Sequence, residues 1–66
     1  MTKQKQLILN IINNARQHYT AEQIFALAQK LMPSIVRATV YNNLNVLLKD
    51  NLIRKICLPN QIDCYD

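Results

Sequence analysis

Apolar residues near the start of the chain recur with the period of an amphipathic helix. Within residues 3–15, the apolar positions that share one stripe are Leu7, Ile8, Ile11, Ile12 and Ala15. This pattern predicts a first helix over residues 3–15, with Asn13 and Asn14 beginning its end. Leu9 faces away from the stripe, so it needs cover from another segment.

A second helix is predicted to begin after Thr20 and to end before Pro33. Thr20 and Gln23 have the spacing of a capping box, and Glu22 stands in the positive first turn. Pro33 stops the helix because the residue before a proline avoids the helical region. The expected inward stripe is Ile24, Leu27, Ala28 and Leu31, with Phe25 at its margin.

A third helix is predicted over residues 37–50, and its two faces differ in chemistry. The apolar face holds Val40, Leu44, Leu47 and Leu48, the opposite face holds Ala38, Asn42, Asn45 and Lys49, and the margins hold Arg37, Thr39 and Tyr41. The polar face is rich in amides rather than charges, and asparagine pairs its donor and acceptor with base edges. Asparagine is also a weak helix former, so helix propensity does not explain its presence here.

Beyond Asn51 the pattern changes from helical to extended. Residues 52–58 favour a strand, residues 59–61 a turn, and residues 62–66 a returning strand. A two-residue turn at Asn60 and Gln61 would place Cys57 opposite Cys64. Three helices followed by a hairpin predict an α+β, mostly α fold, the winged helix-turn-helix, although other small folds use the same order of elements. In that fold the third helix enters the major groove and the hairpin lies beside the DNA backbone.

Length and composition limit the chain to one small domain. It has 66 residues, half of them hydrophobic, and eight Lys or Arg against four Asp or Glu give a net charge of +4. A basic balance favours polyanionic partners such as nucleic acid, although an ordinary basic surface explains it equally well. No apolar run is long enough to cross a bilayer, and no signal cleavage site follows the charged start. We therefore expect a cytoplasmic protein with no membrane partner.

Three ordered motifs resemble the ferric uptake regulator family, and they run through nearly the whole chain. Residues 2–9, TKQKQLIL, are similar to the family's T-x-Q-R-x-x-I-L opening, and residues 18–25, HYTAEQIF, to its H-P-T-A-E-E-I-Y stretch. Residues 33–35, PSI, followed by residues 38–44, ATVYNNL, resemble its P-x-I-S-x-A-T-V-Y-x-x-L pattern. Residues 51–53, NLI, stand where the family has G-L-V before the wing. The YNNL variant is similar to the peroxide-sensing branch.

The resemblance implies a metal-responsive bacterial transcription regulator, expected to be a repressor. Such a regulator forms a homodimer, binds a divalent metal (iron, manganese or zinc) and then binds an A/T-rich palindromic operator in double-stranded DNA. Residues 1–66 match its N-terminal winged-helix DNA-binding domain. The family's C-terminal dimerisation and metal domain, and its extra N-terminal helix, are not matched, so we expect no cofactor in this chain itself.

Four positions depart from the family pattern. Val36 replaces a serine that caps the third helix, which removes about 1 kcal/mol of stabilisation unless Ser34 substitutes. Asn51 replaces a glycine but tolerates the left-handed conformation. Lys5 replaces an arginine and loses its bidentate fork. Cys64 replaces a wing residue that is often arginine, which weakens any backbone contact from that strand.

Tyr41 is the strongest candidate for a base contact. By resemblance it meets the major-groove edge, where an aromatic ring packs on a thymine methyl; the alternative is a tyrosine at the edge of the core. The other candidates have solvated surface as their alternative. They are Thr39, Asn42 and Asn45 for bases or phosphates, and Lys5, Arg37, Lys49 and Lys55 for phosphates.

His18 and Asp66 stand at positions resembling ligands of the family's regulatory metal site. The remaining ligands would come from the second half of such a regulator, so we expect no complete metal site here, and an ordinary surface histidine is the alternative. Cys57 and Cys64 are too few for a four-ligand zinc site, and we interpret them as small, half-buried hydrophobes.

Three classes of function remain to be compared. A DNA-binding module fits best, and a winged helix that binds proteins is the alternative, which predicts an apolar third-helix face. An enzyme is not expected, because the chain has no Gly-rich phosphate loop, no Ser-His-Asp set and a single histidine.

Overall fold

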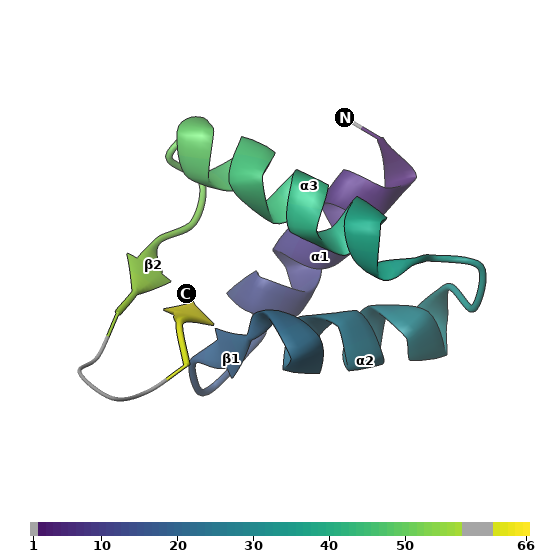
Figure 1. Cartoon of the computed structure of the whole chain (residues 1–66), viewed down its shortest axis with the longest axis horizontal. Coiled ribbons are helices and arrows are strands. Elements are labelled where there is room, and N and C mark those ends of the chain that lie inside the picture. The colour runs from purple at the N-terminus through teal and green to yellow at the C-terminus, as the bar shows by residue number, and fades with distance from the viewer. Residues whose placement is uncertain (1, 58–61) are drawn as a thin grey trace.

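The computed structural model describes residues 2–57 and 62–66 and confirms the predicted class, a mostly helical winged helix (Figure 1). The elements, in chain order, are α1 (Lys3–Asn13), β1 (Tyr19–Thr20), α2 (Ala21–Leu31), α3 (Arg37–Lys49), β2 (Lys55–Ile56) and β3 (Cys64–Tyr65). The first helix ends at Asn13, two residues before the predicted end. No helix among the described residues is both long and apolar enough to span a membrane.

Side-chain hydrogen bonds cap the starts of α1 and α2, of which the sequence predicted the cap of α2. The Gln23 backbone N–H donates to Thr20 Oγ1 at 3.2 Å, and the Thr20 N–H donates to Gln23 Oε1 at 2.9 Å, which confirms the capping box. At α1, the Lys5 N–H donates to Thr2 Oγ1 at 3.2 Å. After α3, Asn51 adopts a φ of 60°, the left-handed turn expected of it.

Three short strands form a sheet at one end of the molecule, on the left in Figure 1, in the order β1-β3-β2. The sequence did not predict β1, because two residues beside a helix cap carry no alternating pattern. β3 pairs antiparallel with both neighbours, with Tyr65 opposite Tyr19 and Lys55, and Cys64 opposite Thr20 and Ile56. The wing therefore packs back onto the helical part through its second strand.

The register of the wing corrects the predicted cysteine pairing. Cys64 lies opposite Ile56, not Cys57, so the connection between the strands is longer than a two-residue turn. Neighbouring side chains of a strand point to opposite faces, which puts Cys57 and Cys64 on different sides of the hairpin. Both are free thiols, Cys57 exposed and Cys64 half-buried. The predicted turn at residues 59–61 lies outside the described residues.

The core lies where the three helices meet, and each helix contacts the other two. Its most deeply buried side chains are Ile8 on α1, Ile24 on α2, and Val40, Leu44 and Leu47 on α3. The others in the core are Ile12, Phe25, Ala28, Ile35, Ile53 and Tyr65. Ile53 and Tyr65 come from the wing segment, so the hairpin is part of the core and not only an appendage.

Two expectations about the helix faces were wrong. Leu31, predicted to face inward, is 68% exposed, because α2 ends there and Met32 and Ile35 supply the apolar cover beyond it. Leu31 instead lines an open groove between α1 and α2. Phe25, predicted at the margin, is buried, and Leu9 finds its cover by packing against the core.

Substitutions on α2 and α3 should separate core positions from this groove. Leu44→Ala should lower the free energy of unfolding by about 2–5 kcal/mol, because it leaves a cavity in the packed centre. Leu31→Ala should change it by less than about 0.5 kcal/mol, because the side chain is already exposed. Urea denaturation followed by circular dichroism measures both. Equal losses in the two variants would show that the groove is closed in solution.

Candidate nucleic-acid interface

The outer face of α3 presents a continuous set of exposed polar side chains. Val40, Leu44 and Leu47 point into the core, and the residues opposite them are therefore held toward solvent. The exposed polar positions on this face are Asn42, Asn45 and Lys49, as the sequence predicted, and the small Ala38 lies among them. Tyr41, predicted at the margin of the face, is exposed beside them. In Figure 1 α3 lies along the upper edge of the molecule. The side of α3 that faces away from the core is therefore open to solvent.

Asparagines on α3 have two different roles. Asn43 is half-buried, and its Nδ2 donates to the Thr39 carbonyl oxygen at 2.8 Å, so it braces the helix itself. Asn42 and Asn45 are exposed on the outer face, where their amides are open to a ligand. Thr39 is half-buried and lies nearer the core than predicted for a contact residue.

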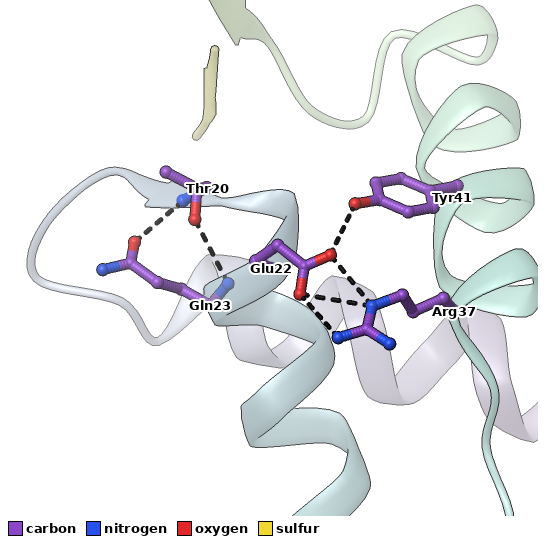
Figure 2. A network of polar contacts seen from close by, with 5 residues as sticks. All are labelled: Thr20, Glu22, Gln23, Arg37 and Tyr41. Atoms are coloured by element: carbon purple, nitrogen blue, oxygen red, sulfur yellow. Dashed lines mark hydrogen bonds and ion pairs between the residues drawn. The ribbon is translucent and has the colours of Figure 1, made fainter. Parts of the chain in front are cut away.

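The start of α3 lacks the usual side-chain cap. Val36 occupies the N-cap with an extended backbone, and no side chain bonds the first backbone N–H groups, so the expected loss of the cap is confirmed and Ser34 does not replace it. Arg37 and Tyr41, on the first turns of α3, are instead tied to α2 by a network of side chains (Figure 2).

Glu22 on α2 is the centre of that network. Its Oε1 accepts hydrogen bonds from the Tyr41 hydroxyl at 2.9 Å and from Arg37 Nε at 3.0 Å, and its Oε2 accepts from Arg37 Nη2 at 3.1 Å. The Arg37 guanidinium also lies over the Phe25 ring, with Cζ 4.8 Å from the ring centre. The capping box at Thr20 and Gln23 fixes the turn of helix that carries Glu22 (Figure 2).

The network shifts the ionisation of its members. Hydrogen bonds from Arg37 and then from Tyr41 hold the pKa of the Glu22 carboxyl below its ordinary value. The same bond to Glu22 raises the pKa of the Tyr41 phenol, because the hydroxyl proton is the one shared with the carboxylate. Glu22 is therefore an anion and Tyr41 a neutral donor at physiological pH.

Three of the four predicted phosphate-binding cations have acidic partners. Lys5 Nζ lies 3.2 Å from Asp50 Oδ2, joining the start of α1 to the end of α3, and Lys55 Nζ lies 3.2 Å from Asp63 on the wing. Arg37 is held by Glu22. Within the part of the chain that the structure describes, Lys49 takes part in no ion pair, so its charge on the outer face of α3 is uncompensated.

Sequence reasoning missed two residues of this surface. Arg54, at the entrance to β2, is 83% exposed, and its Nη2 lies 3.0 Å from Asp66 Oδ2. Glu22 was recognised only as a favourable charge in the first turn of α2. Its contacts join residues 15 and 19 positions apart, and a single sequence carries no periodic signal for such pairs.

The structure brings His18 and Asp66 together, with Nδ1 4.0 Å from Oδ1. Asp66 also bonds the backbone of Arg54, so this pair sits where β1 and the wing meet. Among residues 2–57 and 62–66, no three His, Cys, Asp or Glu side chains are placed to hold a metal ion. The side-chain hydrogen bond with Asp63 raises the pKa of the Cys57 thiol.

Comparison with known proteins identifies the family of this chain. A model of the ferric uptake regulator family matches residues 1–66. The peroxide operon regulator of Bacillus subtilis is 34% identical over 66 residues, which cover all of this chain and 46% of that protein. The peroxide-responsive repressor PerR of Staphylococcus epidermidis is 27% identical over the same length. The chain thus spans less than half the length of these relatives.

Solved structures show the same fold. The Campylobacter jejuni peroxide stress regulator superposes with a TM-score of 0.88 at 36% identity, covering 96% of this chain and 46% of that one. PerR from Streptococcus pyogenes gives a TM-score of 0.91 at 28% identity, covering all of this chain and 46% of that one. The Helicobacter pylori ferric uptake regulator, at 21% identity, has a TM-score of 0.93 over the whole chain and 44% of its own, which shows the shared fold.

Restoring the missing cap should stabilise the start of α3. Val36→Ser should raise the free energy of unfolding by about 1 kcal/mol, because a serine hydroxyl at the N-cap can accept from a free backbone N–H. Val36 is 57% exposed, so little apolar packing is lost with it. Thermal and urea unfolding measure the change, with Ser34→Ala as the control that should have no effect. A destabilised Val36→Ser variant would contradict the assignment of Val36 as the N-cap.

The ionisation of Tyr41 and Glu22 should be coupled. In an NMR titration, the Tyr41 ring should titrate above its ordinary value of 10.0, and Glu22→Ala should bring it back toward that value. Because the folded pKa of Glu22 lies below 4.5, its contribution to stability is complete above pH 4.5 and is lost as the pH falls through the folded value. A Tyr41 titration unchanged by Glu22→Ala would show that the hydrogen bond is absent in solution.

Proposed function

The chain belongs to the ferric uptake regulator family, and we propose that it is the sequence-specific DNA-binding domain of a metal-responsive bacterial transcription repressor. One observation carries the proposal: a core-anchored α3 presents an exposed face of tyrosine, asparagine and lysine on a winged-helix fold. Family membership rests on a match over the full chain, and the peroxide regulators among its relatives support the peroxide-sensing branch.

The side chains of α3 divide into base-contacting and phosphate-contacting groups. Tyr41 offers an exposed ring edge for a thymine methyl, and Asn42 and Asn45 offer amides to base edges in the major groove. Thr39 is a secondary hydrogen-bonding candidate near the start of the helix. Base contacts give the sequence preference, whereas the phosphate contacts fix the register of the helix on the duplex.

Phosphate contacts are proposed for Lys5, Arg37, Lys49 and Lys55. Lys49 contributes first, because it makes no ion pair with another described residue. Each of the other three already has an acidic partner on the protein, which offsets part of the charge that a phosphate would meet. On the wing, β2 is an edge strand, and exposed Arg54 at its entrance is a further candidate for the DNA backbone.

The remaining features of a whole regulator are proposals for a longer protein. Relatives more than twice as long as this chain support a C-terminal half that forms a homodimer and holds iron, manganese or zinc. His18 and Asp66, which lie together beside the wing, would supply two ligands to a site completed by that half. We also propose an A/T-rich palindromic operator, a cytoplasmic location and a role without enzymatic activity, and family membership supports them.

The alternative function, a winged helix that binds proteins, predicts an apolar outer face on α3. The exposed side chains there are mainly amides, a phenol and an ammonium group, and the apolar exposure on α3 is limited to Ala38 and to Val46, which is 36% exposed. No specific observation therefore favours that alternative. Salt dependence also separates the two, because phosphate binding releases counterions.

Two substitutions on α3 should alter DNA binding in different ways. Tyr41→Ala should reduce the preference for a selected duplex over a shuffled one by about five- to 150-fold, the range for one base-edge contact. Lys49→Ala should weaken binding to both duplexes alike and lower the slope of log K against log salt by about one. Fluorescence anisotropy at several salt concentrations measures both effects, with thermal melts to confirm folding.

Lys30→Ala is the matched control for Lys49→Ala. Lys30 lies in the last turn of α2 beside the groove with α1, away from the outer face of α3, so its loss should leave the slope unchanged. A wild-type chain whose binding ignores salt would contradict the proposed function. A folded Tyr41→Ala variant that discriminates as well as the wild type would remove Tyr41 from the base contacts.

A further inference from the structure

A single carboxylate on α2 contacts two of the side chains that we propose for DNA recognition. Glu22 accepts from the Tyr41 hydroxyl at 2.9 Å and from two nitrogens of Arg37 at 3.0 and 3.1 Å. Hydrogen bonds to an ionised acceptor are stronger than those between neutral groups. An acidic side chain beside a surface proposed to bind a polyanion is unexpected. Neither the family motif within α3 nor the exposure of the outer face of α3 explains it.

Arg37 has its charge compensated within the protein. Its guanidinium is held edge-on by both oxygens of Glu22 and lies 4.8 Å over the Phe25 ring. Glu22 engages Nε and Nη2 of Arg37 and leaves the Nη1 donors free, so a phosphate that Arg37 binds there meets a cation already paired with a carboxylate. The pair therefore adds little to the positive charge that an approaching duplex meets, whatever the sequence of that duplex.

Tyr41 has its ring direction fixed by the same carboxylate. The ring is 39% exposed at the edge of α3, and a bond at its hydroxyl leaves the side chain little freedom to rotate. A contact residue ordered before binding loses less conformational entropy in the complex. The fixed orientation of the Tyr41 ring favours one contact geometry between the ring and a DNA base and disfavours other geometries.

We propose that Glu22 is a positioning residue for sequence recognition, which offsets the charge that Arg37 offers to a phosphate and fixes Tyr41 toward the bases. The inference rests on the proposed DNA-binding function and deepens it. Glu22 lowers affinity for duplexes of every sequence and raises the preference among them. The acidic residue thus increases discrimination at the expense of general affinity.

Glu22→Gln tests the first part of the inference. The amide oxygen of the variant can still accept from the Tyr41 hydroxyl, but the charge that held Arg37 is gone. Affinity for a shuffled duplex should rise, and the slope of log K against log salt should steepen by about one as Arg37 gains a phosphate. In an Arg37→Gln background, the same Glu22→Gln substitution should leave the slope unchanged, which assigns the effect to Arg37.

Glu22→Ala and Tyr41→Phe test the second part. The probe is a duplex that the wild-type chain selects from a randomised pool, compared with its shuffled sequence. Both variants should lose about two- to tenfold in preference for the selected duplex, the value of one hydrogen bond that orders the ring. Glu22→Gln, the conservative replacement, should retain the preference.

The outcomes separate this inference from the proposed function. A wild-type chain that binds DNA with steep salt dependence, together with an unchanged slope in Glu22→Gln, would overturn the role of Glu22 alone. Full preference in a folded Tyr41→Phe variant would overturn the positioning of Tyr41, and this variant decides the question if Glu22→Ala does not melt cooperatively. A purely structural Glu22 would lower the melting temperature without steepening the slope. Absence of DNA binding by the wild type would overturn both proposals.

Discussion

Burial of the inner face of α3 is the constraint on which the surface of this domain depends. Val40, Leu44 and Leu47 are almost completely buried against Ile8 of α1 and Ile24 of α2. A helix fixed along one side can present only the opposite side to solvent, so the amide-rich face points outward by geometry. With so few residues in the core, each of these contacts is a large share of the stability that holds that face in place.

Electrostatic pairing divides the basic residues of the chain into two groups. Every acidic side chain has a basic partner, in the pairs Glu22–Arg37, Asp50–Lys5, Asp63–Lys55 and Asp66–Arg54. The net charge of +4 is thus carried by the remaining bases, Lys3, Arg16, Lys30 and Lys49, none of which makes an ion pair within residues 2–57 and 62–66. Lys49 alone among them lies on α3. Exposed pairs of this kind add little stability, so their main effect is on where the charge is available.

Local sequence patterns predicted the helices of the fold well, but they could not predict contacts between segments that are far apart in the sequence. The capping box at Thr20 and the left-handed turn at Asn51 are fixed by residues within a few positions, and both were predicted. The burial of Tyr65 and the strand at residues 19–20 depend on pairing between segments more than forty positions apart. The prediction that Leu31 is buried was wrong for a related reason. A stripe of apolar residues shows which face of a helix points inward, but not how far the neighbouring helices extend along that face.

The candidate site shows the same division between pattern and contact. Exposure of Asn42, Asn45 and Lys49 follows from the helical period, so the outer face of α3 was predictable. The partners of Arg37 and Tyr41 were not, since Glu22 reaches them only through the packing of α2 against α3. A basic residue identified from the sequence is a candidate for binding a DNA phosphate. The acidic side chain paired with it in the structure determines how much of its positive charge is available to that phosphate. The affinity for DNA that we propose would therefore depend on α3 and the wing together with the acidic side chains around them, and a count of basic residues along the sequence overstates it.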